Sequence, residues 1–135
     1  MSDAELDRFA ERLMTNVRDQ AIVDLDARVS EPARDPISRR WAKVIQGDQT
    51  RDTVRALIPE IVDHVLYQLL HAIDNEDLPL AWLNEDGSCT SLEELGLGEM
   101  AGWMMPPEGW RERFSSQRAP DPLGECRDEE GDADD

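Results

Sequence analysis

This chain of 135 residues lacks the motifs that usually reveal an enzyme. It contains no Gly-x-Ser-x-Gly nucleophile elbow, no phosphate-binding P-loop and no complete dinucleotide fingerprint. The two close glycines of Leu95–Gly98 lack the third glycine and the preceding strand of a βαβ unit. We therefore expect a protein without catalytic residues and without a cofactor.

Long apolar runs and clustered cysteines are missing as well. No run approaches the ~18 apolar residues of a membrane-spanning helix, and the acidic start of the chain has no apolar segment of a signal peptide behind it. Cys89 and Cys126 are the only cysteines, and their spacing relative to the histidines matches no zinc module. These absences predict a cytoplasmic protein with free thiols, no metal and no membrane partner.

Basic residues are scarce: 14 Lys and Arg stand against 31 Asp and Glu, which leaves a net charge of −17. Residues 118–135 carry −6 of this charge, so the remaining 117 residues carry −11 and are themselves strongly acidic. Such a surface repels nucleic acid and membrane phosphate and attracts basic surfaces. It predicts a basic protein partner and no direct nucleic-acid binding, although solubility alone would also explain an acidic surface.

Apolar residues recur at helical spacing in two long segments, one ending near Arg28 and one from Thr50 to about Asn75. Pro59 lies inside the second segment and predicts a kink or a break there. We expect a mainly α, single-domain helical bundle over residues 1–117 and a disordered acidic tail over residues 118–135. The predicted core residues are Phe9, Leu13, Val17, Leu57, Ile61, Val65, Leu69 and Ile73.

Turn signals divide the rest of the chain. Asp35-Pro36 predicts the start of a short helix that ends at Gly47. Residues 80–90 predict a small β-hairpin around a four-residue turn, Asn84–Gly87. Three glycines interrupt the stretch from Ser91 to Met105, and the sequence leaves open whether residues 95–105 are helix or loop.

His64 and His71 are the only histidines, and their seven-residue spacing places them on one side of the second long helix. Glu60, Asp63 and Tyr67 share that side, opposite the apolar stripe, so we predict a polar surface that faces a partner. Zinc ligands on adjacent turns are spaced i and i+4, and that arrangement is absent. A small metal-dependent enzyme that uses His64 and His71 is the weaker alternative.

Aromatic residues are few but include four tryptophans. Trp103 and Trp110 lie close to three methionines and to Glu108, which is typical of a small core or of an exposed patch that anchors a partner. Direct stacking on nucleic acid would need a basic groove, and Arg111 and Arg113 are interleaved with acidic residues. A homodimer in which tryptophans bury each other is a further alternative.

Four stretches resemble a group of small, acidic bacterial proteins of the toxin-immunity type. The stretches are Leu6–Leu13, Leu69–Asp74, Gly96–Trp103 and Gly109–Ser115, and the resemblance spans Leu6 to Arg118. It implies a protein that neutralises a toxin delivered between competing bacteria. The glycine-tryptophan stretches are its most specific part, and no binding residue can be carried over from it.

The charge, the small size and the resemblance together predict a non-enzymatic inhibitor, an immunity protein that covers a basic or active-site surface of a bacterial toxin. The main alternative is a nucleic-acid mimic that blocks a restriction or CRISPR effector, because carboxylates arrayed on helices can imitate phosphates. The oligomeric state stays open. The predicted partner-binding residues are Glu60, Asp63, His64, Tyr67, His71, Trp103, Glu108 and Trp110.

Overall fold

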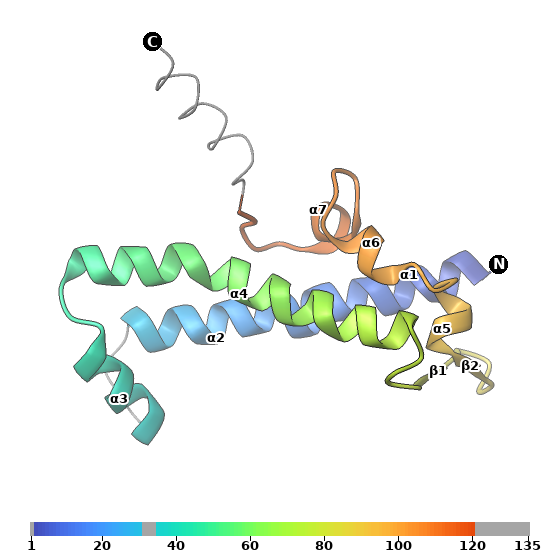
Figure 1. The fold of residues 1–135 in the computed structure, drawn as a ribbon, viewed down its shortest axis with the longest axis horizontal. Coiled ribbons are helices and arrows are strands. Elements are labelled where there is room, and N and C mark those ends of the chain that lie inside the picture. The colour runs from blue at the N-terminus through green and yellow to red at the C-terminus, as the bar shows by residue number, and fades with distance from the viewer. Residues whose placement is uncertain (1, 31–34, 121–135) are drawn as a thin grey trace, which may run out of the picture.

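Two long helical segments run antiparallel and form the body of the molecule (Figure 1). The computed structural model describes residues 2–30 and 35–120. The first segment consists of α1 (Ser2–Arg12), the π-helical turn η1 (Leu13–Arg18) and α2 (Asp19–Ser30), and the second is α4 (Asp48–Asp74). We call these two segments the helix pair.

Shorter elements pack at the two ends of the helix pair and along one side (Figure 1). They are α3 (Pro36–Val44), β1 (Ala81–Leu83), β2 (Cys89–Ser91), α5 (Leu92–Leu95), α6 (Met100–Met104) and α7 (Trp110–Phe114). The predicted class, mainly helical with a small hairpin, is confirmed. Of the predicted disordered tail, residues 118–135, the structure describes residues 118–120, where Arg118 binds Asp26, so the prediction places the start of the tail too early. The rest of the tail, from Asp121 onward, lies outside the described residues.

The π-helical turn η1 changes which residues of the first segment are buried. The Asp19 amide donates to the Met14 carbonyl, five residues back, and this wider turn rotates the residues that follow it. As a result Arg18 and Asp19 are buried, whereas Val17 keeps 45% of its surface exposed. The prediction that Val17 belongs to the core is wrong because it assumed a regular α-helical period through this turn.

Helix α4 continues through Pro59, whose side chain is buried, and its axis bends near its middle (Figure 1). The predicted kink therefore occurs without a break in the helix. None of the helices in the described ranges is long and apolar enough to cross a membrane. The buried side of α4 is formed by Ile58, Val62, Leu66, Leu70 and Ile73.

The burial of α4 is rotated by one residue from the predicted pattern. Leu57, Ile61 and Val65 were expected in the core, but they are 46%, 57% and 62% exposed. One residue corresponds to about 100° of rotation around a helix, so a neighbouring side of α4 packs against the first segment. Of the other predicted core residues, Phe9, Leu13 and Ile73 are buried and Leu69 is partly buried.

Aromatic and methionine side chains fill the end of the core where α1 meets α5, α6 and α7. The Phe9 ring lies edge-on to Trp82 at 5.5 Å and to Trp110 at 6.0 Å between centroids. Such edge-to-face contacts are favourable for aromatic quadrupoles and add to the burial of apolar surface. Leu92, Leu95, Met100 and Met104 are buried in the same core.

The predicted hairpin is confirmed, with Leu83 paired to Cys89 and a loop from Asn84 to Ser88. The loop is closed by the backbone amide of Asn84, which donates a hydrogen bond to the backbone carbonyl of Ser88 at 2.8 Å. Glu5 ties the hairpin to α1, because it accepts hydrogen bonds from the Trp82 indole at 3.0 Å and from the Glu85 amide at 3.2 Å. These hydrogen bonds, chiefly that from Trp82, lower the pKa of Glu5.

The glycine-rich stretch alternates short helices and turns. Gly98 has a φ of +66° in the turn between α5 and α6, a conformation that glycine adopts without a steric cost. Gly109 directly precedes α7, and a Cβ atom there would lie 2.4 Å from the Trp103 carbonyl oxygen. Close backbone approach and turn formation therefore both account for glycines in this part of the chain.

Candidate functional site

A cluster of charged residues is buried where α7 and the C-terminal segment meet the helix pair. The Arg18 side chain is 0% exposed, and its Nε and Nη2 atoms donate to the two Asp63 carboxylate oxygens at 2.6 Å and 3.3 Å. Arg111 Nη1 donates to Asp63 Oδ2 at 2.6 Å. Asp63 was predicted to face a partner, and that prediction is wrong: it is 2% exposed and forms ion pairs with Arg18 and Arg111 within the protein.

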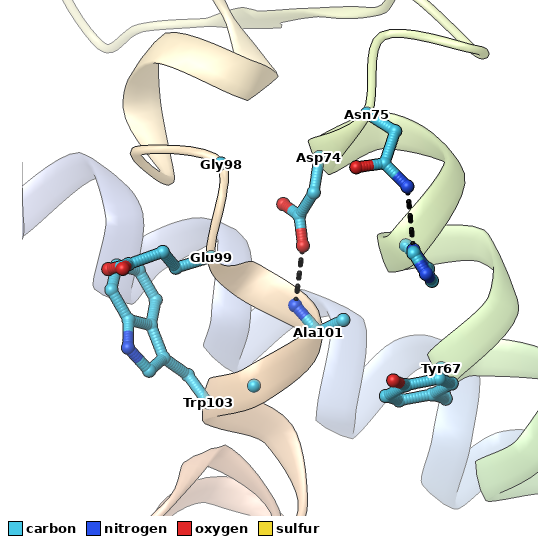
Figure 2. Close-up of a pocket in the computed structure, with 9 residues that line it drawn as sticks. Tyr67, Asp74, Asn75, Gly98, Glu99, Ala101 and Trp103 are labelled. Carbon is cyan, nitrogen blue, oxygen red and sulfur yellow. Dashed lines mark hydrogen bonds between the residues drawn. The ribbon is translucent and has the colours of Figure 1, made fainter.

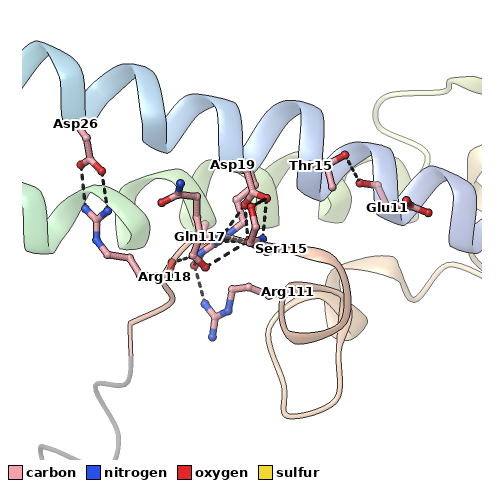
Figure 3. Close-up of polar contacts among 11 residues, drawn as sticks. Glu11, Thr15, Asp19, Asp26, Arg111, Ser115, Gln117 and Arg118 are labelled. Carbon is pink, nitrogen blue, oxygen red and sulfur yellow. Dashed lines mark hydrogen bonds and ion pairs between the residues drawn. The ribbon is translucent and has the colours of Figure 1, made fainter.

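Residues 115–118 extend this cluster along α2 (Figure 3). The Ser115 hydroxyl donates to Asp19, and the Ser116 amide donates to Asp19 Oδ2 at 2.8 Å. Arg118 forms a bidentate pair with Asp26 at 2.7 Å and 3.0 Å. We call this side of the helix pair the covered side, because hydrogen-bonded charges hold the C-terminal segment against it.

An open hollow of about 390 Å³ lies between the C-terminal half of α4 and α6 (Figure 2). We call it the α4/α6 hollow. It is lined by Tyr67, His71, Asp74, Asn75, Gly98, Glu99, Ala101, Gly102 and Trp103. None of these lining residues is lysine or arginine, and two of them are acidic.

Asp74 sets the position of α6 beside α4. Its two carboxylate oxygens accept hydrogen bonds from the backbone amides of Met100 at 3.0 Å and Ala101 at 2.8 Å. On the same side of α4, the Tyr67 ring lies edge-on to His71 at 5.9 Å, and His71 Nδ1 lies 2.8 Å from the Asn75 side-chain nitrogen. The α4 side of the hollow is therefore formed, in order along the helix, by the Tyr67 ring, the His71 imidazole and the Asp74 carboxylate.

Trp103 lies between the α4/α6 hollow and a second hollow of about 630 Å³. Its ring is on the side of α6 away from Tyr67, so the two rings do not form a cage (Figure 2). Its centroid is 6.3 Å from that of Trp110. The second hollow is lined by Leu6, Asp7, Leu95, Leu97, Trp103, Pro106, Pro107, Glu108, Gly109, Trp110 and Arg113.

The predicted aromatic anchors differ in burial. Trp110 is 3% exposed and packs against Phe9, so the prediction that it fills a pocket of a partner is wrong. Trp103 is only partly buried, and Glu108 is exposed at the rim of the second hollow.

The structure brings together three predicted site residues that come from separate parts of the sequence. Tyr67, His71 and Trp103 all line the α4/α6 hollow. Glu60 and His64 are exposed on α4, but they do not line this hollow.

Asn75 and Glu99 also line the hollow, and neither was predicted as a site residue. Asp74 links α4 to α6 through hydrogen bonds with Met100 and Ala101, which follow it by 26 and 27 residues in sequence. The spacing of residues within one helix does not predict such contacts.

The histidines of α4 have no metal-binding arrangement in the part of the chain that the structure describes. Within residues 2–30 and 35–120, no group of three or more His, Cys, Asp or Glu is placed to hold a metal ion. His64 and His71 are both exposed and seven residues apart.

Comparisons of this chain with protein-family models, with curated proteins and with solved structures find no match.

Proposed function

We propose that this chain is a non-enzymatic binding protein that covers a basic or active-site surface of another protein, as an immunity protein does for its toxin. The observation that carries the proposal is the α4/α6 hollow, which combines Asp74, Glu99 and aromatic side chains without any Lys or Arg in its lining. A net charge of −17 would steer a basic partner towards this protein.

In the proposed complex, a Lys or Arg side chain of the partner enters the α4/α6 hollow. Its cationic group lies near Asp74, while the stem packs against Tyr67 and the α6 backbone. Glu99 is exposed beside Trp103, on the other side of α6 (Figure 2), and would contact the partner at the edge of the hollow. Asp74 already accepts two backbone hydrogen bonds, and a carboxylate has lone pairs for more. The exposed residues Glu60, His64 and Glu108 would contact the partner around this hollow.

The proposal implies that one dominant partner binds through the hollow. Capture from the lysate of the native organism at low salt, followed by a salt gradient, should retain this partner in near-stoichiometric amount. Glu99→Lys should weaken retention at least about tenfold, because it replaces an acidic group at the edge of the hollow with a charge that repels a basic partner. Asp52→Lys, which makes the same charge change at an exposed position near the start of α4, is the matched control and should have a small effect.

Two results would contradict the proposal. Equal losses from Glu99→Lys and Asp52→Lys would mean that general acidity, rather than the hollow, holds the partner. A broad set of nucleic-acid-binding proteins, all released at low salt, would favour a nucleic-acid mimic instead.

A further inference from the structure

Four residues expected in the core are exposed on the helix pair: one on the first segment and three on α4. Val17, Leu57, Ile61 and Val65 are 45%, 46%, 57% and 62% exposed. The three α4 residues are four positions apart, so they lie above one another on one side of the helix. Partly buried apolar residues extend these exposed positions into two stripes, namely Ala21 and Leu25 on α2 and Val54 and Leu69 on α4.

Both stripes lie on the side of the helix pair opposite the covered side. Asp19 and Asp63 point into the covered side, where they bind Ser115 and Arg111. Ala21 follows Asp19 by two positions and Ile61 precedes Asp63 by two, and two residues correspond to about 200° around a helix. We call the surface formed by Val17, Ala21, Leu25, Val54, Leu57, Ile61, Val65 and Leu69 the open face.

Helix α4 therefore has apolar residues on two neighbouring sides, and within residues 2–30 and 35–120 only one of them is packed. A helix with such a wide apolar surface is typical of a bundle in which it has neighbours on both sides. Contiguous exposed apolar residues mark an interaction site more often than scattered ones do.

The charge of the open face indicates which partner it fits. On α4, the charged residues between Val54 and Leu69 lie on other sides of the helix, so its stripe supplies no acidic group that would steer a basic partner. On α2, Asp24 and Arg28 border the stripe, and Arg28 pairs with Asp35. A second copy of the chain presents the same uncharged α4 stripe, so contact between the two α4 stripes opposes apolar groups without opposing like charges.

We propose that a second copy of this chain covers the open face, so that two helix pairs form a four-helix bundle around a two-fold axis. Such an interface is isologous: each residue contacts its symmetry-related region in the other copy. This inference goes beyond the proposed function and uses a different surface from the α4/α6 hollow, so either proposal can fail without the other.

The size of the open face and the charge of the molecule determine how strongly two copies should associate. The stripe from Val54 to Leu69 is about 22 Å long, and two helices side by side are about 20 Å wide, so the contact covers roughly 440 Å² on each copy and about 900 Å² in total. This area is below that of standard stable interfaces, so we expect a weak, concentration-dependent dimer. Two copies with a charge of −17 each repel one another at long range. Salt screens this repulsion and should therefore strengthen the association, the reverse of its effect on a basic partner.

Sedimentation of the full chain over a wide concentration range, at low and at high salt, tests the proposal. The mass should rise from 15.3 kDa towards twice that value with concentration, and at lower concentration when salt is high. Ile61→Gln and Val65→Gln should each weaken the association on the order of 100-fold, because each change occurs twice in a two-fold interface.

Val44→Gln is the matched control for Val65→Gln. Val44 lies on α3, outside the eight residues of the open face, and is 74% exposed, so its replacement should leave the association unchanged. Circular dichroism should show that all three variants remain folded, because each changes an exposed side chain. A mass of 15.3 kDa under every condition, or association that Ile61→Gln and Val65→Gln do not weaken, would overturn the proposal.

Discussion

On one side of the helix pair, charged residues are buried under the C-terminal segment; on the other side, apolar residues face solvent. The covered side holds Arg18, Asp19 and Asp63, all under 10% exposed. The open face carries Ile61 and Val65, both more than half exposed. The comparison shows that the elements packed on a helix, rather than the polarity of its residues alone, decide which of its sides is buried.

The covered side can bury charge because every charged group there has a partner. Arg18 and Arg111 share Asp63, Ser115 and Ser116 bind Asp19, and Arg118 pairs with Asp26 (Figure 3). Buried charges of this kind add little net stability over well-packed apolar residues, but removal of one partner is costly. The network therefore specifies where residues 111–118 lie more than it strengthens the fold.

Among the changes on the covered side, Asp63→Ala should lower the unfolding free energy the most. The change removes the carboxylate between Arg18 and Arg111 and leaves the fully buried Arg18 guanidinium without its main counter-charge. Loss of one member of a buried ion pair costs about 3–5 kcal/mol of unfolding free energy. Urea denaturation followed by circular dichroism measures this loss.

Two further variants control this measurement. Glu60→Ala, one turn earlier on the exposed side of α4, should change stability by about 0.5 kcal/mol or less. The triple change Arg18→Met, Asp63→Leu, Arg111→Met should recover most of the loss, because apolar residues can replace a buried ion cluster. If Asp63→Ala cost no more than Glu60→Ala, the ion pairs would not hold this side together.

Ile58→Ala and Ile61→Ala sharpen the comparison within one helix. Ile58 is 2% exposed and its truncation should cost about 2–5 kcal/mol of unfolding free energy. Ile61 is 57% exposed, so the same truncation should cost less than about 1 kcal/mol. Both are measured by denaturation at low protein concentration, where self-association does not contribute. Equal losses would mean that Ile61 is buried in the monomer.

The smallest expected effect concerns Asp35, the N-cap residue of α3. This helix lies at the end of the helix pair. Its carboxylate caps α3 and accepts hydrogen bonds from the Ser38 amide and hydroxyl, and then from Arg28, which together lower its pKa from 3.8 to about 2. Because the folded pKa is lowered, the cap stabilises α3 fully above about pH 4. This contribution is lost as the pH falls through about 2.

NMR titration of the Asp35 carboxyl should therefore give a midpoint near 2. Hydrogen exchange should show that α3 loses protection in acid. Asp35→Asn keeps a good N-cap but cannot titrate, so its α3 should lose less protection between about pH 4 and 2. A midpoint near 3.8 would show that Asp35 is not engaged as the cap.

Local patterns in the sequence predicted the elements of this fold well. The helical spacing of apolar residues predicted both long segments, Asp35-Pro36 predicted the start of α3, and residues 80–90 predicted the hairpin. Each of these signals acts within a few residues, through side-chain periodicity, capping or turn chemistry. Sequence analysis also proposed Tyr67, His71 and Trp103 as site residues, and the structure places them at one hollow.

The burial of individual residues could not be predicted in the same way. The π-helical turn at Leu13–Arg18 rotates α2, and Arg18 meets Asp63, 45 residues away. Asp74 similarly binds the start of α6 from 26 residues away. Such contacts depend on how separate segments approach one another, which local periodicity does not encode.

The sequence by itself therefore determined the helical class, the acidic character, the approximate extent of the two long segments, the start of α3 and the hairpin, because these follow from local backbone preferences and charge. The tertiary structure decided that Arg18 and Asp63 are buried, that Trp110 belongs to the core, and that Leu57, Ile61 and Val65 remain exposed. The physical reason is that α4 has two apolar sides, and only the packing of distant segments selects which of them the monomer covers.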